Sequence, residues 1–510
     1  MDESADEVIF VWGCGEDGQL GLPSAPVTSH ACTPDWCVPT PTALVLPDGE
    51  RVGDRRVGRS IESSENEIEI ENNTTLWKPI VAGSRNSAAV SKSGALYTWG
   101  WNSHDTLGLD TDEEYISLPR KVVWGDEISG TETMGSKKEN KATDASSNKE
   151  KETKQIVTDS FSLGGWHAVA VTDSNRAFAW GGNEYGQAGV DSSARDERHA
   201  GIHVSEHVSV PSAVAFPRVA DLSGRTQKTT QDLSVKVVQC ACGGMNSFAV
   251  LENGSVYQWG ALVGSEQEPA RVPRLVRGVR SVAAVAAGMF HVIALTNENK
   301  VFAWGKGDYG QLGLGRPGNW DAPMEVIGLS GCASGLGDAT SGVKVGRGGG
   351  ATKDDNDDDA KNYRVTFVAA GGWHSCALTE SGTCVMWGRG EYGRLGMGDD
   401  QTDKQTPTAV DFSFSASDPC SDGNASGTRF RKITDAALGG SHTVFVDTEG
   451  TAWTVGRNNH GRLGRVVHGK WTGNPGPVLF PPHSSSKTWR CKTAAAGGRH
   501  TIAIAVATTE

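Results

Sequence analysis

The chain has 510 residues, of which 37% are hydrophobic, and a formal net charge of −13. Such an acidic chain is a poor match for phosphate backbones, so we expect no nucleic acid as its main partner. The acidic start MDESADE differs from a secretory signal peptide, and no run approaches the ~18 apolar residues of a membrane helix, so we expect no membrane association. We predict a cytoplasmic protein, with the nucleus as the alternative.

One short pattern recurs from the N-terminus to the C-terminus. It is an apolar run that ends in Trp-Gly and is followed in most copies by a glycine-rich stretch, as in VFAWGKGDYGQLGLG from Val301. Internal repeats have to be recognised before any single motif is interpreted. The fourth copy is degraded after Gly260. The anchor positions are Trp12, Trp99, Trp180, Trp259, Trp304, Trp387 and Val455.

A second motif precedes most anchors by 13 residues. It consists of two small residues, one variable residue, a His or Asn and an apolar run, as in GGWHAVAV from Gly164. The last copy, from Gly497, has no anchor after it, and Trp12 has no such motif before it. The chain therefore starts and stops within a repeat. Each unit predicts two short strands joined by a glycine turn, for example at 380–382.

The strands predict a fold in which both faces of each sheet are covered. Runs such as VFAW and VIAL are apolar at successive positions, which suits sheets that stack around an axis. We therefore predict an all-β, seven-bladed β-propeller, formed as a single domain over residues 8–506. Pairing of the N-terminal strand VIFVWG with the C-terminal strand TIAIAV would close the ring and cover its free edges.

The glycine stretch GKGDYG at 305–310 has the spacing of a dinucleotide-binding loop. A cofactor site requires a helix directly after such a loop, whereas QLGLG and further loop follow here. Glycines that allow positive φ in a repeated turn explain the spacing without a ligand, so we predict no cofactor. We also predict no metal site, because Cys240 and Cys242 have no partner pair at zinc spacing. The His of the second motif lie on different blades, and we expect each to bond a backbone carbonyl of a neighbour.

Repeats of the form GGxH…WGxGxxGQLG resemble those of the regulator of chromosome condensation 1 (RCC1) family. The resemblance covers about residues 8–506 and implies a seven-bladed propeller. That family includes the Ran exchange factor, a plant ultraviolet-B photoreceptor and propellers that only bind other proteins, so the fold does not settle the function. The photoreceptor motif has a Trp two positions before the His. In this chain, that position holds Ser84, Gly165, Gly244, Met289, Gly372, Gly440 and Gly498, which disfavours light sensing.

The residue directly before each His or Asn tests the exchange-factor hypothesis. In the Ran exchange factor, acidic residues near these strand starts face the GTPase, but the corresponding slots here contain no Asp or Glu. Ran exchange is therefore disfavoured, while exchange on another small GTPase remains the alternative. The slots hold Arg85, Trp166, Met245, Phe290, Trp373, Ser441 and Arg499.

Six of these slots have the composition of an interface hot spot. We predict that Arg85, Trp166, Met245, Phe290, Trp373 and Arg499 form a protein-binding face, and the alternative is that each packs against the next blade. The predicted function is a regulatory protein–protein interaction platform with no catalytic residues of its own. The alternative function is a guanine nucleotide exchange factor for a small GTPase. We expect a monomer whose partner is a protein, with a small GTPase as one candidate.

The spacing between anchors predicts long inserts rich in Gly, Ser, Asp, Lys and Asn. Such segments bury too little apolar surface to become ordered, so we predict disordered loops. An acidic run, DDNDDD at 354–359, lacks the Gly and Glu of a calcium-binding loop and is interpreted as a solvated charge run. The predicted inserts are 48–75, 126–158, 192–235, 331–363 and 412–430.

Overall fold

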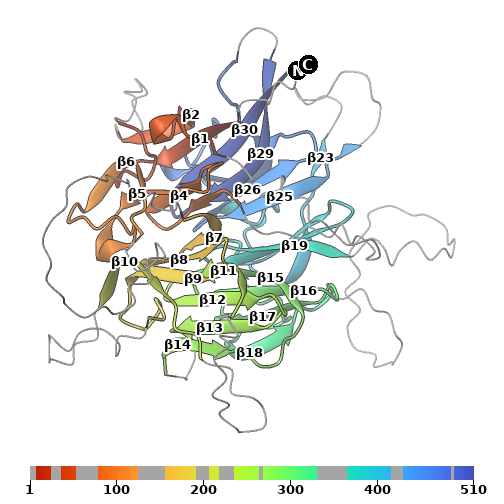
Figure 1. The fold of residues 1–510 in the computed structure, drawn as a ribbon. Coiled ribbons are helices and arrows are strands. Elements are labelled where there is room, and N and C mark those ends of the chain that lie inside the picture. The colour runs from red at the N-terminus through yellow and green to blue at the C-terminus, as the bar shows by residue number, and fades with distance from the viewer. Residues whose placement is uncertain are drawn as a thin grey trace, which may run out of the picture.

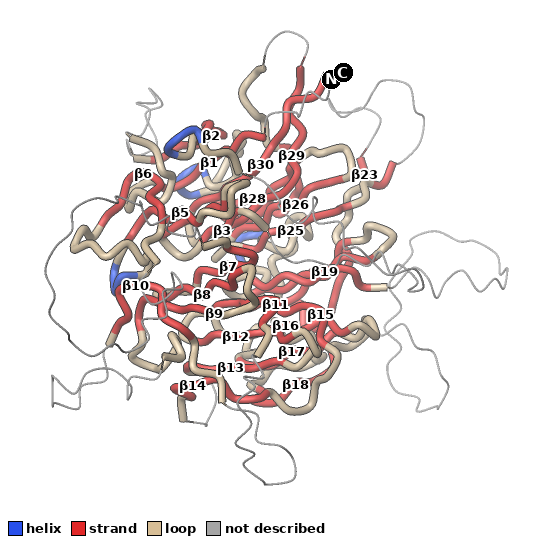
Figure 2. The backbone as a smooth tube through the Cα atoms, viewed as in Figure 1, coloured by secondary structure: helices blue, strands red, loops and turns tan. Residues whose placement is uncertain are grey.

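The structure is a computed structural model of the chain. It describes residues 7–23, 36–52, 78–124, 156–190, 206–217, 235–262, 268–329, 364–414, 429–483 and 487–509. Within these ranges the chain consists of strands and loops with short 3-10 turns, as Figure 2 shows. The 3-10 helices are η1 (Pro47–Gly49), η3 (Ser103–Asp105), η7 (Glu391–Gly393) and η8 (Asn459–Gly461). No helix in the described ranges is long and apolar enough to cross a membrane.

The strands form seven four-stranded antiparallel sheets, named here blades 1 to 7 and given from the innermost strand outward. Blade 1 contains β29 (Lys487–Ala496), β30 (His500–Thr509), β1 (Glu7–Cys14) and β2 (Cys37–Leu44). Blade 2 contains β3 (Ile80–Ala82), β4 (Asn86–Val90), β5 (Leu96–Trp101) and β6 (Tyr115–Lys121). Blade 3 contains β7 (Thr158–Leu163), β8 (His167–Thr172), β9 (Ala177–Gly182) and β10 (His207–Ala213). Blade 4 contains β11 (Val237–Cys242), β12 (Asn246–Leu251), β13 (Val256–Gly260) and β14 (Ala270–Leu275).

The remaining three blades follow the same order along the chain. Blade 5 contains β15 (Val282–Ala287), β16 (His291–Thr296), β17 (Val301–Gly305) and β18 (Trp320–Glu325). Blade 6 contains β19 (Val365–Ala370), β20 (His374–Thr379), β21 (Cys384–Gly388) and β22 (Lys404–Ala409). Blade 7 contains β25 (Ile433–Leu438), β26 (His442–Asp447), β27 (Ala452–Arg457) and β28 (Trp471–Pro477). A short ribbon of β23 (Ser413–Phe414) and β24 (Arg429–Phe430) lies between blades 6 and 7 in sequence.

The two ends of the chain meet in blade 1. Strand β1 pairs with β30 in a continuous register from Glu7↔Val506 to Gly13↔His500, and Figure 1 shows the termini side by side. The predicted seven-bladed propeller and its closure by the terminal strands are confirmed. Closure matters because it gives both terminal strands a partner and removes two free sheet edges.

One predicted insert is wrong in part. Strand β10 lies inside the segment 192–235 and forms the outer strand of blade 3. Its residues are mostly exposed or half-buried, so it lacks the apolar signature of the inner strands. Parts of the other predicted inserts are also ordered: Thr158 begins β7, and Val52 bridges to Ser91. The rest of the five predicted inserts falls largely outside the described residues.

The core of the molecule is divided among the interfaces between blades. Among the described residues, one apolar cluster lies between each pair of neighbouring blades, and each cluster contains a buried Trp. In blade 7 the anchor position holds Val455, and Trp453 of the same strand fills the cluster instead. The anchor residues are thus core residues, which accounts for their recurrence in every repeat.

A hydrogen-bonded unit, called here the interblade latch, ties each of several blades to the next. In the first example, the Gln19 carbonyl accepts from Trp99 Nε1 at 3.0 Å and from Ser87 Oγ at 2.7 Å. Ser87 Oγ also lies 2.8 Å from His500 Nε2. The same carbonyl, hydroxyl and His set recurs as Gln187–Ser247–His167, Gln311–Ser375–His291, Arg394–Thr443–His374 and Arg462–Thr501–His442.

The latch corrects the expected partner of the motif His. Each of these His lies against a hydroxyl of the next blade rather than a backbone carbonyl. The latch is missing at two interfaces. Between blades 2 and 3, the motif residue is Asn86, Ala168 replaces the hydroxyl, and Trp180 Nε1 donates to the Thr106 carbonyl at 3.0 Å. Between blades 4 and 5, Trp304 Nε1 donates to the Gln258 side chain at 2.9 Å because the fourth repeat lacks the glycine loop. There the motif residue is Asn246, and Val292 replaces the hydroxyl.

Candidate functional site

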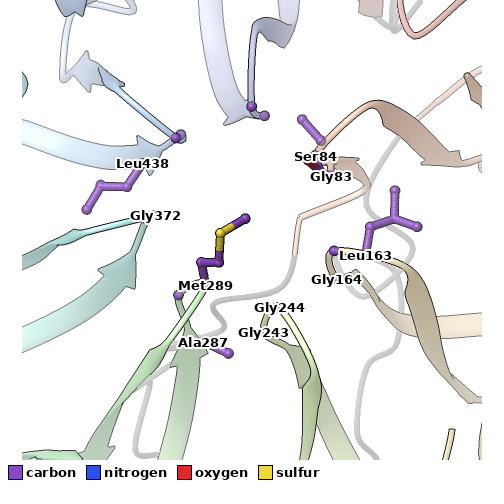
Figure 3. Close-up of a pocket in the computed structure, with 18 of the residues that line it drawn as sticks. Gly83, Ser84, Leu163, Gly164, Gly243, Gly244, Ala287, Met289, Gly372 and Leu438 are labelled. Atoms are coloured by element: carbon purple, nitrogen blue, oxygen red, sulfur yellow. The ribbon is translucent and has the colours of Figure 1, made fainter. Parts of the chain in front are cut away.

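The turns between the first and second strands of all blades surround one end of the central channel. We call this side of the propeller the loop face. The opening is bordered by the first two residues of the second motif, which are small in every blade except for Met289: Gly83–Ser84, Gly164–Gly165, Gly243–Gly244, Gly288–Met289, Gly371–Gly372, Gly439–Gly440 and Gly497–Gly498. Figure 3 shows part of this lining, with Gly83, Ser84, Gly164, Gly243, Gly244 and Gly372 around the opening and Met289 extending toward its centre.

Small residues are required at this opening because backbones of neighbouring blades meet there. The amide of Gly372 donates to the Gly439 carbonyl at 3.0 Å, and the amide of Gly440 donates to the Gly497 carbonyl at 3.1 Å. A Cβ on Gly371 would lie 2.8 Å from that same Gly439 oxygen. The glycines thus serve close packing of the blades, which leaves the next residue of each turn to face outward.

Two of the outward residues meet in an aromatic cluster across blades 5 and 6. The rings of Phe290 and Trp373 are 4.7 Å apart, and Tyr309 lies 5.3 Å from Trp373. Lys306 Nζ is 5.7 Å from the Trp373 ring, and Arg389 lies over Tyr309 at 4.5 Å. All five side chains are half-buried rather than sealed in the core. We call these residues the aromatic cluster.

The cluster combines three rings with two cations, and this composition suits binding. Cations over ring faces are held in place while they keep part of their charge accessible. Lys306 and Arg389 each also contact a carboxylate, Asp308 at 3.2 Å and Glu391 at 2.6 Å. The result is a surface with apolar area and charges of both signs, held by neighbouring loops of two blades. It can bind a protein surface by burying the rings and pairing the charges.

Among the five motif-turn residues outside the cluster, Arg85 has a structural role. Its Nε donates to Asp17 Oδ2 at 2.7 Å, and its guanidinium lies 4.4 Å from the Trp101 ring. Asp17 is buried in the loop that blade 1 extends onto blade 2. The hydrogen bond to Asp17 raises the pKa of Arg85. Arg85 therefore links blades 1 and 2.

The family model described as RCC1-like domain matches residues 8–509. The chain belongs to the RCC1-like domain family. It is 25% identical over 404 residues to the mitochondrial RCC1 domain-containing protein RUG3 of Arabidopsis thaliana, covering 76% of this chain and 69% of RUG3. It is also 25% identical over 433 residues to the human E3 ubiquitin-protein ligase HERC2, covering 83% of this chain but only 7% of HERC2.

A solved structure supports the RCC1-like fold. The structure of Prp20p from Saccharomyces cerevisiae matches with a TM-score of 0.61 and 18% identity, covering all (100%) of this chain and 93% of that one. Its title describes binding to Gsp1p and histones, which is a property of Prp20p. At this identity the match establishes the fold of the RCC1-like chain and leaves its partner open.

The RCC1-like propeller separates the remaining predicted site residues from the aromatic cluster. Trp166, on blade 3, is 36% exposed, and no aromatic ring among the described residues contacts it. Met245 lies on blade 4, and Arg499, on blade 1, pairs with Glu16 at 3.3 Å. Of the six predicted binding residues, the described structure joins only Phe290 and Trp373 in one cluster. The binding role of the other four remains a prediction.

Sequence reasoning missed four acidic residues of the RCC1-like loop face. They lie four residues after an anchor Trp, in the loop after the third strand of a blade, rather than in the slots before the His. Three of them pair with a cation: Glu16 with Arg499 at 3.3 Å, Asp308 with Lys306 at 3.2 Å and Glu391 with Arg389 at 2.6 Å. The fourth, Glu184, lies 4.0 Å from His104 Nε2. The constant offset from the anchor was the signal that could have identified them.

Proposed function

We propose that this chain is a protein-interaction platform whose aromatic cluster on the loop face binds a protein partner. The observation that carries the proposal is the meeting of Phe290 and Trp373 at 4.7 Å, flanked by Lys306 and Arg389. The rings are half-buried, although the core of each blade interface already has its own Trp. Aromatic and Arg residues of this kind commonly dominate binding energy at interfaces.

The proposal is tested by partner capture with a matched pair of variants. The purified chain, Trp373→Ala and Leu479→Ala would be used to capture partners, followed by quantitative mass spectrometry. Leu479 is 71% exposed and follows β28 at the end of blade 7 away from the loop face, so it controls for the loss of apolar area. We expect Trp373→Ala to weaken capture of a specific partner at least about tenfold, since a hot-spot Trp contributes ~2 kcal/mol or more. Equal capture by all three proteins would contradict the proposal.

A second candidate function is nucleotide exchange on a small GTPase. The acidic residues Glu16, Glu184, Asp308 and Glu391 on the loop face favour it, because negative charge there was the feature expected to favour an exchange factor. An exchange factor acts by binding the nucleotide-free GTPase more tightly than the nucleotide-bound form. Release of fluorescent GDP from a panel of small GTPases, Ran included, tests this candidate. Strong acceleration of one GTPase would establish exchange, and no acceleration would leave the interaction platform.

A further inference from the structure

A groove lies between blades 4 and 5, at one of the two interfaces without a latch. In the intact repeats, the glycine loop after the third strand reaches onto the next blade, but the fourth repeat lacks it. The groove is lined by Leu262, Glu268, Arg274, Leu275 and Arg277 of blade 4 and by Asp321 and Pro323 of blade 5, among others. Residues 263–267 of the shortened loop lie outside the described residues. Strands β14 and β18, which form its walls, are neighbours in Figure 1.

Four arginines follow one another at intervals of three residues along this rim. We call Arg271, Arg274, Arg277 and Arg280 the arginine strip. All four side chains are exposed, and none forms an ion pair with any residue that the structure describes. Two exposed apolar side chains lie between them, Val272 at 39% and Leu275 at 51% exposure. In a chain with a net charge of −13, an unpaired basic strip of this density is a marked local exception.

The same position in blade 2 shows how this fold neutralises an arginine on an outer strand. Arg120 pairs with Thr98 in the sheet register, and Arg274 pairs with the corresponding Gln258. Arg120 Nη1 and Nη2 bond the two oxygens of Glu113 at 2.6 Å and 2.8 Å. The arginine strip has no such carboxylate among the described residues, so its bidentate donors are available to a ligand.

We propose that the groove and the arginine strip bind an extended acidic segment of a partner protein that also carries an apolar residue. Carboxylates satisfy the planar donors of Arg274 and Arg277, and Leu275 offers an apolar contact between them. Strand addition at this edge is not the mode of binding, because Pro273 removes a backbone donor in the middle of β14. Nucleic acid fits less well, since its long phosphate backbone would extend over the rest of an acidic chain, whereas a short segment can place its carboxylates on the arginines alone. This site is separate from the aromatic cluster.

The test uses fluorescence anisotropy on the full chain with a short fluorescent peptide of alternating Asp, Glu and Leu. A peptide with Lys in place of the acidic residues and a single-stranded oligonucleotide are the comparison ligands. We expect the acidic peptide to bind, and the double variant Arg274→Glu/Arg277→Glu to weaken its binding by about tenfold or more. Arg120→Glu is the matched control at the equivalent position and should leave the affinity unchanged. Thermal unfolding of each variant would confirm that the fold is intact.

Three results would overturn the proposal. The first is equal binding of the peptide by the wild type and by the folded double variant. The second is tighter binding of the oligonucleotide than of the peptide through the same arginines, which would assign the strip to nucleic acid. The third is a tenfold or greater gain in peptide affinity when the Asp residues of 354–359 are changed to Asn, because the acidic run of this chain would then be the occupant.

Discussion

At the residue scale, the interblade latch defines the protonation of the motif His. Ser87 has a single hydroxyl proton, which it donates to the Gln19 carbonyl, so its oxygen must accept from His500 Nε2–H. His500 is therefore protonated on Nε2, and its Nδ1 has no hydrogen-bond partner among the described residues. Burial opposes charging of the ring and lowers its pKa from 6.5 to about 3. Neutral histidines thus hold the blades together.

This protonation state predicts a loss of stability in mild acid. Burial lowers the pKa of His167 from 6.5 to about 4, so the unfolded state binds more protons between these values. The free energy of unfolding should therefore be highest above pH 6.5 and fall as the pH drops toward 4, by about 3 kcal/mol for this His alone. Urea unfolding across this pH range measures the decline.

A matched variant isolates the contribution of one latch. The double change His167→Asn/Ser247→Val copies the Asn246 and Val292 pair that the chain itself has between blades 4 and 5. Between pH 6.5 and 4, its stability should fall by about 3 kcal/mol less than that of the wild type, since one depressed pKa has been removed. An unchanged pH dependence would refute the assignment of a buried neutral His167.

At the scale of the single element, the glycine after the anchor allows the third strand of a blade to lie close to the turn that precedes its second strand. Gly388 has a φ of +101°, and a Cβ there would lie 2.7 Å from the Trp373 carbonyl. The contact links the end of β21 to the turn that carries a residue of the aromatic cluster. A side chain at position 388 would therefore both strain the backbone and displace the aromatic cluster.

Two alanine variants should separate conformational strain from steric overlap. Gly328 has a φ of +80° with no atom within 4 Å of an added Cβ, so Gly328→Ala should cost about 1 kcal/mol for the left-handed backbone alone. Gly388→Ala should cost more, ~3 kcal/mol or above, because it adds the overlap with Trp373. Denaturant unfolding of both variants measures the difference. Equal costs would show that the contact at Gly388 relaxes freely.

The elements also show what the sequence could predict. The inner strands repeat a strong apolar pattern, so the blades and their closure followed from the sequence. Strand β10 was missed because an outer strand such as His207–Ala213 carries few buried apolar residues. The aromatic cluster was only partly predicted: Phe290 and Trp373 were named, but Lys306, Tyr309 and Arg389 come from other loops. Their meeting depends on side-chain directions that repeat spacing does not specify.

At the scale of the whole molecule, the ring depends on blade 1, which combines the first and last strands of the described chain. Strands β1 and β30 pair over seven residues, Glu7 to Gly13. The two interfaces of this blade are latched through Thr501 and His500. Every blade contacts two neighbours, so an open ring would expose the apolar clusters on both sides of the gap.

Removal of the closing strand should therefore abolish cooperative folding. Deletion of residues 500–510 removes β30 and both latches of blade 1, and thermal unfolding should lose its sharp transition because two apolar clusters become exposed. Deletion of 507–510 alone keeps the Glu7↔Val506 pair and should leave the transition nearly unchanged. A sharp transition in the longer deletion would mean that the ring does not require closure.

The molecule as a whole presents the aromatic cluster on one face and the arginine strip on its outer rim. The most direct test of the proposed platform is photo-crosslinking in a cell extract, with a photoreactive phenylalanine analogue placed at Tyr309 or, as the control, at Leu479. Tyr309 lies in the aromatic cluster, and Leu479 lies at the end of blade 7 that is opposite the loop face. We predict a discrete protein crosslink from position 309 that is absent from position 479 and is lost when Trp373→Ala is added. A crosslink from 479 alone, or one from 309 that persists without Trp373, would contradict the central claim.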